Sequence, residues 1–371
     1  MPPLVMWKVI KSLPKISVLS LCVIPSLIMH SLHMGEGVPL FLLSALGILG
    51  TVTLMGRSTE EISIYAGPLW GGLINATFGN VTELMIAIMA LQKLELHDVV
   101  RSSITGSILG NLLLVLGAAM VYGGMKYPVQ KFTRTGANVN IGMLWVAMIC
   151  LLVPTFVHLV YNWDPKLNKA NFPILEHQIS LAAACVLLGL YALSLIFSLR
   201  THRFMLMPHE GEHEEAEWSL KTAVGMLLGG TLVAAFLSEV FVDSMNHMLH
   251  VQGIGISEMF VGVVIVAVVG NASEGSVAIW VARENKMELS YQIAMGSCLQ
   301  IALMVAPVLV LVSHAIGKPM SLALNPFEMV ALLAAVQIAT TSLQDGESNW
   351  LEGALFLATY VFFACVFWFH P

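Results

Sequence analysis

The chain has 371 residues, of which 57% are hydrophobic and only 11% are charged, and its formal net charge at pH 7 is −6. A soluble domain carries about 25% charged residues, so this composition and a mean hydropathy of +0.82 exclude a protein surrounded by water on all sides. The composition predicts an all-α, polytopic membrane protein whose surroundings are the lipid bilayer. The charges lie in short loops and form no basic tract, so no nucleic-acid partner is expected.

Apolar runs long enough to cross a bilayer occur about eleven times along the chain. A spanning helix needs about 20 mostly apolar residues, and a backbone in lipid must satisfy its own hydrogen bonds, which favours helices. The predicted helices span residues 16–34, 37–64, 68–92, 98–124, 138–161, 175–200, 219–249, 256–283, 289–315, 325–343 and 349–369.

Basic residues are divided unevenly between the two sets of loops. If the N-terminus is inside, 12 of the 17 Lys and Arg residues fall in inside loops. Because basic loops favour the cytoplasm, we expect a cytoplasmic N-terminus and a C-terminus on the opposite side. The basic N-terminal stretch resembles a signal peptide, but no small-x-small cleavage site follows, so we expect the first helix to be retained. The sequence is compatible with a plasma or inner membrane and with an organelle membrane. It is also compatible with a monomer and with a homo-oligomer.

Short motifs recur in the two halves of the chain in the same order. GNVTE (Gly79–Glu83) matches GNASE (Gly270–Glu274) at an offset of 191 residues. The next helix repeats GSILGN as GSCLQ, and the preceding helix repeats STE as SE. With the first helix set aside, each half has five helices, and an odd number inverts the second half in the membrane. The expected organisation is an N-terminal helix (1–36), a first repeat (37–200), an acidic cytoplasmic linker (201–218) and a second repeat (219–371).

Two carboxylates, Glu83 and Glu274, lie near the bilayer centre on helices that correspond in the two repeats. An ionised carboxylate at that depth is costly, so each must face the protein interior and be neutralised. The pair can be neutralised by a metal cation or by protons. If a bound cation excludes protons, and bound protons exclude the cation, the site can exchange one for the other, which is the thermodynamic basis of antiport.

The neighbours of these glutamates offer the oxygen ligands that a hard cation prefers. Gly and Asn weaken a helix, so an unwound turn at either motif would direct backbone carbonyls toward the site. Calcium takes 6–8 oxygen ligands, whereas zinc and copper prefer His or thiolate, and no His lies near either motif. We therefore predict Ca²⁺ as transported substrate, ligated by Glu83 and Glu274, without a cofactor. The other candidate ligands are Asn80, Asn271, Ser107, Asn111, Ser297 and Gln300. Asn111 is assigned less directly, because the Gly-Ser pairs place Gly110 opposite Gln300.

Three further acids, Glu60, Glu239 and Asp243, lie on the helices that precede the two motifs. Glu60 is toward the cytoplasmic end of its helix and Glu239 is toward the outside end of its own, as inversion requires. Asp243 follows Glu239 by four residues on the same helix face. These acids are candidates for a gating or proton and cation pathway, and solvated acids near helix ends remain the alternative.

The linker between the repeats contains HEGEHEEAEWS, which fits the zinc protease motif H-E-x-x-H at His209 and His213. A glycine in the middle and the crowd of acids argue against a zinc-binding helix, so we expect no enzyme. The linker is either a solvated acidic loop or a regulatory acidic helix that gathers calcium. Its acids are Glu210, Glu212, Glu214, Glu215 and Glu217.

The motif stretches resemble the two α-repeats of the Ca²⁺/cation antiporter superfamily, and within it the CAX branch of calcium/proton exchangers. The resembling stretches are GGLINATFGNVTELMIAIMAL, VVGNASEGSVAIWVA and GSCLQIALMVAPVLVLVS. The resemblance covers roughly residues 37–370 and implies eleven helices, a midplane cation site and alternating access. It implies that Glu83 and Glu274 are cation ligands and proton acceptors, with Asn80, Asn271 and Gln300 beside them. Its acidic helix is similar to the acidic linker of this chain.

The resulting prediction is a Ca²⁺/H⁺ antiporter that works by alternating access. Gln300 stands where sodium-coupled members tend to have Asp or Asn, which favours protons as the counter-ion. Sodium/calcium or potassium/proton exchange by the same fold remains the alternative. A cation channel and an intramembrane metalloprotease are the rivals from other classes.

Overall fold

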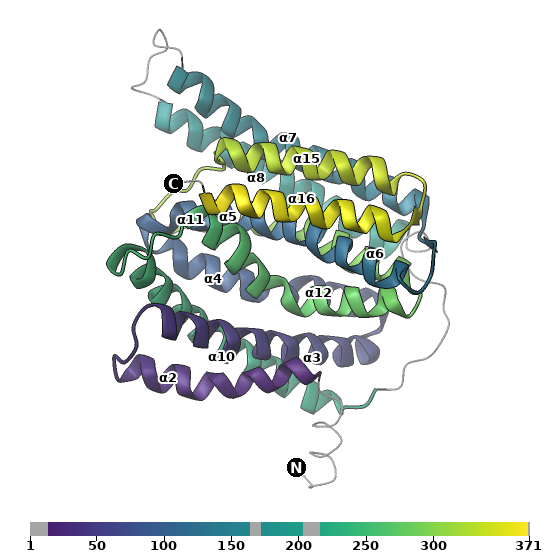
Figure 1. Ribbon diagram of the computed structural model, residues 1–371, viewed down its shortest axis with the longest axis horizontal. Coiled ribbons are helices and arrows are strands. Elements are labelled where there is room, and N and C mark those ends of the chain that lie inside the picture. The colour runs from purple at the N-terminus through teal and green to yellow at the C-terminus, as the bar shows by residue number, and fades with distance from the viewer. Residues whose placement is uncertain (1–13, 164–171, 203–215, 370–371) are drawn as a thin grey trace. The chain divides into compact units, whose positions relative to one another are not determined.

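The computed structural model describes residues 14–163, 172–202 and 216–369. In these ranges the chain is built almost wholly of helices, with two strands of two residues each (Figure 1). Nine helices there are long and apolar enough to cross a membrane, and two shorter apolar helices, Lys15–Ser31 and Val81–Leu91, accompany them. The predicted all-α polytopic fold is confirmed, whereas the exact count of eleven crossings is not.

The nine long helices agree with the predicted ranges to within a few residues. Several contain short segments labelled η that continue the helix; η2 is a 3₁₀ segment, and η3, η5, η6, η7 and η8 are π-helical. The spans are Val38–Gly67 in α3 (Val38–Phe78); Leu94–Gly124, formed by η2 (Leu94–Leu96), α5 (His97–Leu109), η3 (Gly110–Val115) and α6 (Leu116–Gly124); Arg134–Tyr161 in α7 (Arg134–Trp163); Phe172–Thr201, formed by α8 (Phe172–Ile196) and η5 (Phe197–Thr201); Leu220–Val251, formed by α10 (Leu220–Asn246) and η6 (His247–Val251); Glu258–Arg283, formed by α11 (Glu258–Phe260), η7 (Val261–Val266) and α12 (Ala267–Arg283); Met287–Ala315, formed by α13 (Met287–Gln300), η8 (Ile301–Val305) and α14 (Ala306–Ala315); α15 (Pro326–Leu343); and α16 (Trp350–Phe369).

The chain forms two compact units, each of which draws on both halves of the sequence. Unit 1 comprises the described parts of Met1–Met89, His209–Ile256 and Val269–Glu274. Unit 2 comprises the described parts of Ala90–Pro208, Ser257–Val268 and Gly275–Pro371. Unit 1 thus contains both copies of the GN-x-x-E motif, together with the helices that precede them.

Within unit 1, α3 is a helical hairpin. Gly67 has φ 75° and ψ 171°, a conformation open to glycine, and the following Pro68 disfavours a helical residue before it. The two arms then run back along each other: Ser63 Oγ donates to the carbonyl of Gly71 (3.3 Å), and Thr59 Oγ1 lies 3.4 Å from Asn75 Oδ1. The predicted break between helices 37–64 and 68–92 is therefore present at Gly67.

The long arm of α3 packs antiparallel to α10, and both run side by side in Figure 1. Tyr65 contacts Trp218 at the start of α10, while the rings of Phe41 and Phe241 stack at 4.7 Å near its far end. Since α3 and α10 occupy corresponding places in the two halves, this antiparallel pairing supports an inverted repeat.

Within unit 2, three predicted inside loops meet at one end. Strand β1 (Gln130–Lys131) pairs antiparallel with β2 (Glu347–Ser348), so the loop after α6 joins the loop before α16. The side-chain amide of Gln130 also donates to the carbonyl of Ala282 (2.7 Å), which lies beside the loop after α12. These contacts agree with the predicted alternation of loops between two faces; the cytoplasmic assignment of one face remains a prediction.

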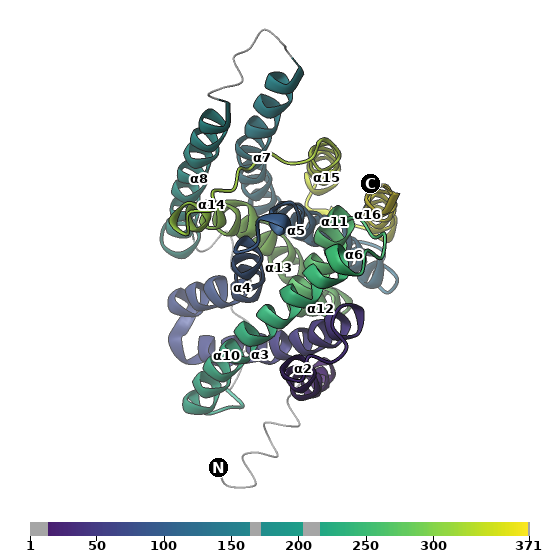
Figure 2. The same ribbon diagram turned by 90° about the vertical axis from the view of Figure 1, so that its left-hand side faces the viewer.

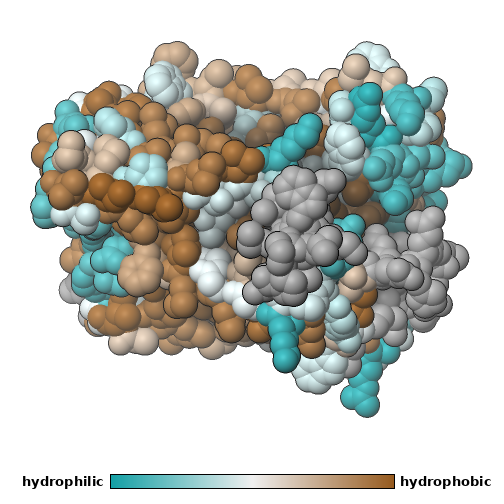
Figure 3. Space-filling model, turned by 90° about the horizontal axis from the view of Figure 1, so that it is seen from below, coloured by the Kyte–Doolittle hydropathy of each residue, from teal (hydrophilic) through white to brown (hydrophobic). Residues whose placement is uncertain are grey.

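Much of the described surface is apolar. Figure 3 shows brown hydrophobic residues over a large part of one face, with teal hydrophilic residues toward its left-hand and right-hand edges. Large exposed side chains include Phe156, Leu193, Phe236 and Phe362, each more than half exposed. Exposed apolar side chains of this size suit contact with lipid. In unit 2, α7 and α8 stand side by side in Figures 1 and 2 and are among the helices that expose most of their apolar residues.

Candidate cation-binding site

The first motif interrupts its helix, as the weak helix formers predict. Helix α3 ends at Phe78 and α4 (Val81–Leu91) begins after Gly79-Asn80. The predicted helix 68–92 is therefore two pieces. The backbone at Gly79 keeps helical dihedral angles (φ −56°, ψ −44°), and its N–H still donates to the carbonyl of Asn75 at 2.8 Å, so the interruption is short.

Packing of α4 fixes the face that Glu83 occupies. Val81 and Met85 pack against a core cluster of unit 1 that includes Met55 and Trp218. Glu83 lies two residues from each, and two residues turn an α-helix by about 200°. Its carboxylate is thereby directed away from that core.

The second motif does not interrupt its helix, contrary to the expectation for a Gly-Asn pair. Gly270 and Asn271 lie inside the continuous α12. The intrinsic preference of two residues is worth about 1–2 kcal/mol, which packing overrides readily. The interruption of the helix is thus confined to the first repeat.

The two motifs cross each other inside unit 1, with each glycine against the other repeat's glutamate. A Cβ atom placed on Gly79 would lie 2.5 Å from Glu274 Oε1, and one placed on Gly270 would lie 2.6 Å from Glu83 Cγ. The offset of 191 residues that relates Gly79 to Gly270 also relates Glu83 to Glu274. The contact is therefore reciprocal, as an approximate two-fold axis through the crossing requires.

Buried polar side chains surround this crossing. Asn80 and Thr82 are 1% exposed, and Asn271 and Ser273 are 6% and 9% exposed. Both glutamates are half-buried. In the described ranges no group of three or more His, Cys, Asp or Glu side chains is placed to hold a metal ion. A cation here would therefore rely on two carboxylates and on neutral oxygens, which suits calcium better than zinc.

The remaining predicted ligands gather in unit 2. Asn111 Nδ2 donates to Ser297 Oγ (3.0 Å) and to the carbonyl of Ser107 (3.1 Å), and all three residues are at most 4% exposed. Gln300, half-buried, ends α13 one turn beyond Ser297. The structure thus brings Ser107, Asn111 and Ser297 together.

A π-helical segment follows each copy of the GS motif. Segment η3 begins at Gly110 and η8 begins at Ile301, again 191 residues apart. π-Helical turns are rare and frequently lie at functional sites. Their matched positions extend the repeat from sequence to backbone geometry, a feature that no residue pattern signalled.

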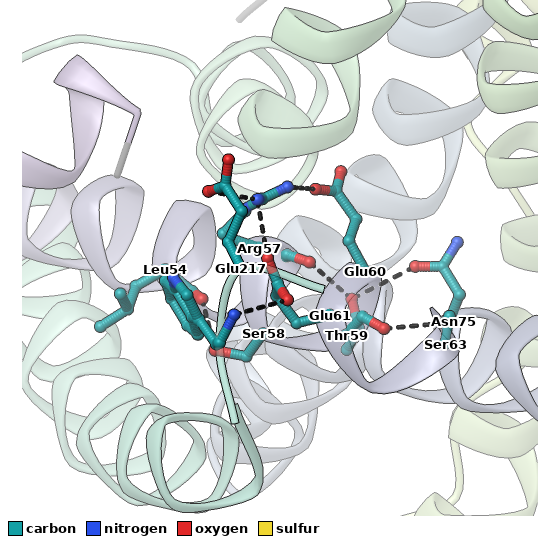
Figure 4. A network of polar contacts seen from close by, with 11 residues as sticks. Leu54, Arg57, Ser58, Thr59, Glu60, Glu61, Ser63, Asn75 and Glu217 are labelled. Atoms are coloured by element: carbon teal, nitrogen blue, oxygen red, sulfur yellow. Dashed lines mark hydrogen bonds and ion pairs between the residues drawn. The ribbon is translucent and has the colours of Figure 1, made fainter. Parts of the chain in front are cut away.

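The predicted gate residue Glu60 belongs to a network around Arg57 in unit 1 (Figure 4). The guanidinium contacts Glu60 at 3.2 Å, Glu61 at 2.7 Å and Glu217 at 3.1 Å. Glu60 and Glu217 are about half exposed, whereas Glu61 is fully buried. Arg57 thus neutralises a buried carboxylate and joins α3 to the end of the acidic linker.

Glu61 is the member of this network that sequence reasoning missed. Its Oε2 accepts the backbone N–H of Trp218 at 3.0 Å, and the Tyr65 hydroxyl donates to the Trp218 carbonyl at 2.6 Å. Trp218 is 1% exposed, so both polar groups of its backbone are bound by α3 side chains. The only available signal was the Glu-Glu pair, since two adjacent helix residues cannot face the same side.

Glu239 and Asp243 lie on α10, toward the opposite end of the α3–α10 pair from Glu60. Glu239 is exposed and Asp243 is half-buried. Of the linker acids, Glu217 is described above, while Glu210, Glu212, Glu214 and Glu215 lie outside the described residues. His209 and His213 lie outside them as well. The pathway and regulatory roles remain predictions.

Comparison with known proteins identifies the class of molecule. The family model described as sodium/calcium exchanger protein matches residues 36–200 and 222–369. The chain is 42% identical over 359 residues to the Ca(2+)/H(+) antiporter of Synechocystis sp., covering 92% of this chain and 94% of that protein. It is 40% identical over 349 residues to the Ca(2+)/H(+) antiporter ChaA of Bacillus subtilis, covering 93% and 96%. The solved structure of native YfkE is similar with a TM-score of 0.80 and 35% identity, over 96% of this chain and 100% of that one.

The duplicated helical membrane fold, with a carboxylate crossing shared by its two halves, defines a secondary transporter of the antiporter type. The chain belongs to the sodium/calcium exchanger protein family, within the Ca²⁺/cation antiporter superfamily.

Proposed function

We propose that this protein exchanges Ca²⁺ for H⁺ by alternating access, with the cation and protons competing for Glu83 and Glu274. The N-terminus is cytoplasmic, and Ca²⁺ leaves the cytoplasm as protons enter. Two carboxylates that must lose protons before calcium binds suggest at least two protons for each calcium.

The reciprocal crossing of the two motifs carries this proposal. Each glutamate lies against the glycine of the other repeat, so both carboxylates belong to one crossing instead of two separate helix faces. An ionised carboxylate at membrane depth costs about 3 kcal/mol or more on insertion scales, and a bound cation or proton offsets that cost. The two states of charge neutralisation supply the two loaded forms of an exchanger.

The relatives support the choice of ions. Two relatives that match almost the whole chain at 40% identity or more are both named Ca(2+)/H(+) antiporters. We propose that Asn80 and Asn271, both buried beside the glutamates, contribute neutral oxygens to the cation. Ser107, Asn111, Ser297 and Gln300 stay predicted ligands that the same assay tests one at a time.

The test is calcium flux in sealed vesicles that contain the purified full-length protein, a calcium dye and an imposed pH gradient. Glu83→Gln and Glu274→Gln each remove one charge at nearly constant shape, and we expect each to abolish gradient-driven flux. Glu347→Gln is the matched control, because Glu347 is a half-exposed partner of Lys131 in the β1–β2 clasp, at 3.1 Å. It should retain the native rate.

Each other outcome identifies a different protein. Native flux that needs no pH gradient would indicate a channel. Flux driven by a sodium gradient, or potassium moved in place of calcium, would indicate the other ion pairs of this fold. Glutamine variants that still exchange calcium would overturn the paired-carboxylate mechanism.

A further inference from the structure

Two histidines line a cavity in unit 2 that the exchange mechanism does not use. The cavity has a volume of about 310 Å³ and is lined by Ile174, His177, Gln178, Leu181, His314 and Pro319. His177 lies in the second turn of α8, and His314 lies in the last turn of α14. Both are therefore near helix ends, where an ion from water can reach them.

The two imidazole rings are neighbours from different helices. Their centroids are 5.7 Å apart and the rings meet edge to face, at an interplanar angle of 89°. The other lining residues are apolar except for Gln178. Among the residues that line the cavity, His177 and His314 are therefore the main candidate metal ligands.

Hydrogen bonding fixes the tautomer of His314. Its Nδ1 lies 2.8 Å from the carbonyl oxygen of Val310. A carbonyl only accepts, so Nδ1 carries the proton and donates it, which leaves the lone pair on Nε2. Metal-bound histidines almost always donate their second ring N–H to a carbonyl or carboxylate in this way. His314 is thus already arranged as a neutral Nε2 ligand.

His177 supplies the second observation. Its Nδ1 is buried and finds no hydrogen-bond partner among the described residues. Leaving a buried nitrogen without a partner is costly, and a native group of this kind calls for an explanation such as a bound ion.

We propose that His177 and His314 form a binding site for a divalent transition-metal ion such as Zn²⁺. Imidazole nitrogen suits zinc, nickel and copper, whereas calcium prefers oxygen, so the site would not compete for the transported ion. The side-chain oxygen of Gln178 and water complete a four-coordinate shell. A bound ion would tie α8 to α14, and α14 continues the helix that carries Ser297 and Gln300. Bound zinc should therefore restrict the movement of that helix relative to α8 and slow calcium exchange.

Titration of the purified full-length protein with ZnCl₂ in calcium-free buffer, followed by calorimetry, tests the site. His177→Phe keeps an aromatic ring and removes both nitrogens, and His314→Ala removes the preset ligand. We expect each variant to lose one zinc equivalent per chain. Co²⁺ in place of zinc should give the intense visible absorption of a tetrahedral site in the native protein and lose it in both variants.

Two controls separate this site from other histidines. The double variant His209→Ala/His213→Ala removes the pair in the acidic linker, and His158→Ala removes a histidine that pairs with Glu176 in the same unit. Both should keep the zinc equivalent and the cobalt absorption. Zinc binding that survives His177→Phe and His314→Ala, or that disappears only with the linker pair, would overturn the proposal.

Discussion

Gly79 and Gly270 are residues at which the two halves of the protein meet closely in unit 1. Neither glycine is required by its own backbone conformation, because neither has a positive φ. Each is required by the carboxylate of the opposite repeat, which occupies the space that a Cβ atom would fill. A residue that looks like a helix breaker in sequence is therefore a packing residue in the structure.

Gly79→Ala should weaken calcium binding without removing any charge. The added methyl would lie 2.5 Å from Glu274 Oε1 and must displace it. Overpacking of this kind costs about 1–3 kcal/mol, or roughly thirtyfold in calcium affinity at the middle of that range. The measurement is the calcium concentration that gives half-maximal flux in vesicles.

Gly225→Ala is the matched control, since a Cβ on Gly225 meets nothing within 4 Å. It should leave calcium affinity unchanged. Equal affinities for the two alanine variants would show that Glu274 does not bind the cation in this position.

At this scale the sequence predicts a role for Glu83 and Glu274 but gives no sign of the buried carboxylate of Glu61. Glu83 and Glu274 are conspicuous because a charge in an apolar helix is costly. The sequence analysis names Glu60 and not Glu61 as a pathway candidate, since a single sequence does not reveal which of two adjacent acids is buried. Only the contacts with Arg57 and Trp218 distinguish them.

At the scale of elements, the contacts of Glu61 with Arg57 and with the backbone N–H of Trp218 hold the start of α10 against α3. Glu61→Ala should lower the thermal stability of the purified protein in detergent, because it removes the acceptor of the Trp218 N–H and a contact to Arg57. A hydrogen bond to a charged group is worth about 1.5–3 kcal/mol. Glu60→Ala should leave stability nearly unchanged, since an exposed pair contributes about 0–1 kcal/mol. Thermal unfolding of the two variants measures the difference.

Tyr65→Phe gives a milder version of the same test. It removes one hydrogen bond to the Trp218 carbonyl, worth about 1 kcal/mol, and should fall between the two alanine variants. If Glu61→Ala and Glu60→Ala unfold at the same temperature, the buried pair does not anchor this junction.

Hydropathy predicted the bounds of the long apolar helices well. It did not predict the features inside and between them that depend on tertiary packing. The long apolar helices end within a few residues of their predicted bounds, and the Gly67-Pro68 break follows from local chemistry. The Gly-Asn pairs, with the same composition, interrupt one helix and not the other. The two-residue strands and the π-helical segments carry no periodic signal, so only tertiary contacts reveal them.

At the scale of the whole molecule, competition between calcium and protons predicts the sign of the pH dependence. Lowering the pH protonates the carboxylates and should weaken equilibrium calcium binding. At pH values where both carboxylates are protonated, the calcium dissociation constant should rise about tenfold for each unit by which the pH falls, for each proton that calcium must displace. A slope near two would show that both glutamates release a proton.

Calcium binding to the purified protein, measured at constant ionic strength over a series of pH values, gives this slope directly. Glu274→Gln should reduce it by about one, because one of the two competing protons is lost. An affinity that does not change with pH would contradict proton coupling at this site.

The reciprocal glycine–glutamate contact also has a consequence for the history of the chain. After a duplication that produced two such halves, neither copy of the motif could drift by itself. A bulkier residue at 79 must be answered by a change at 274, and one at 270 by a change at 83. Residues in contact tend to vary together, so the strongest long-range covariation in this lineage should link each half to the other, at a separation close to the length of one copy.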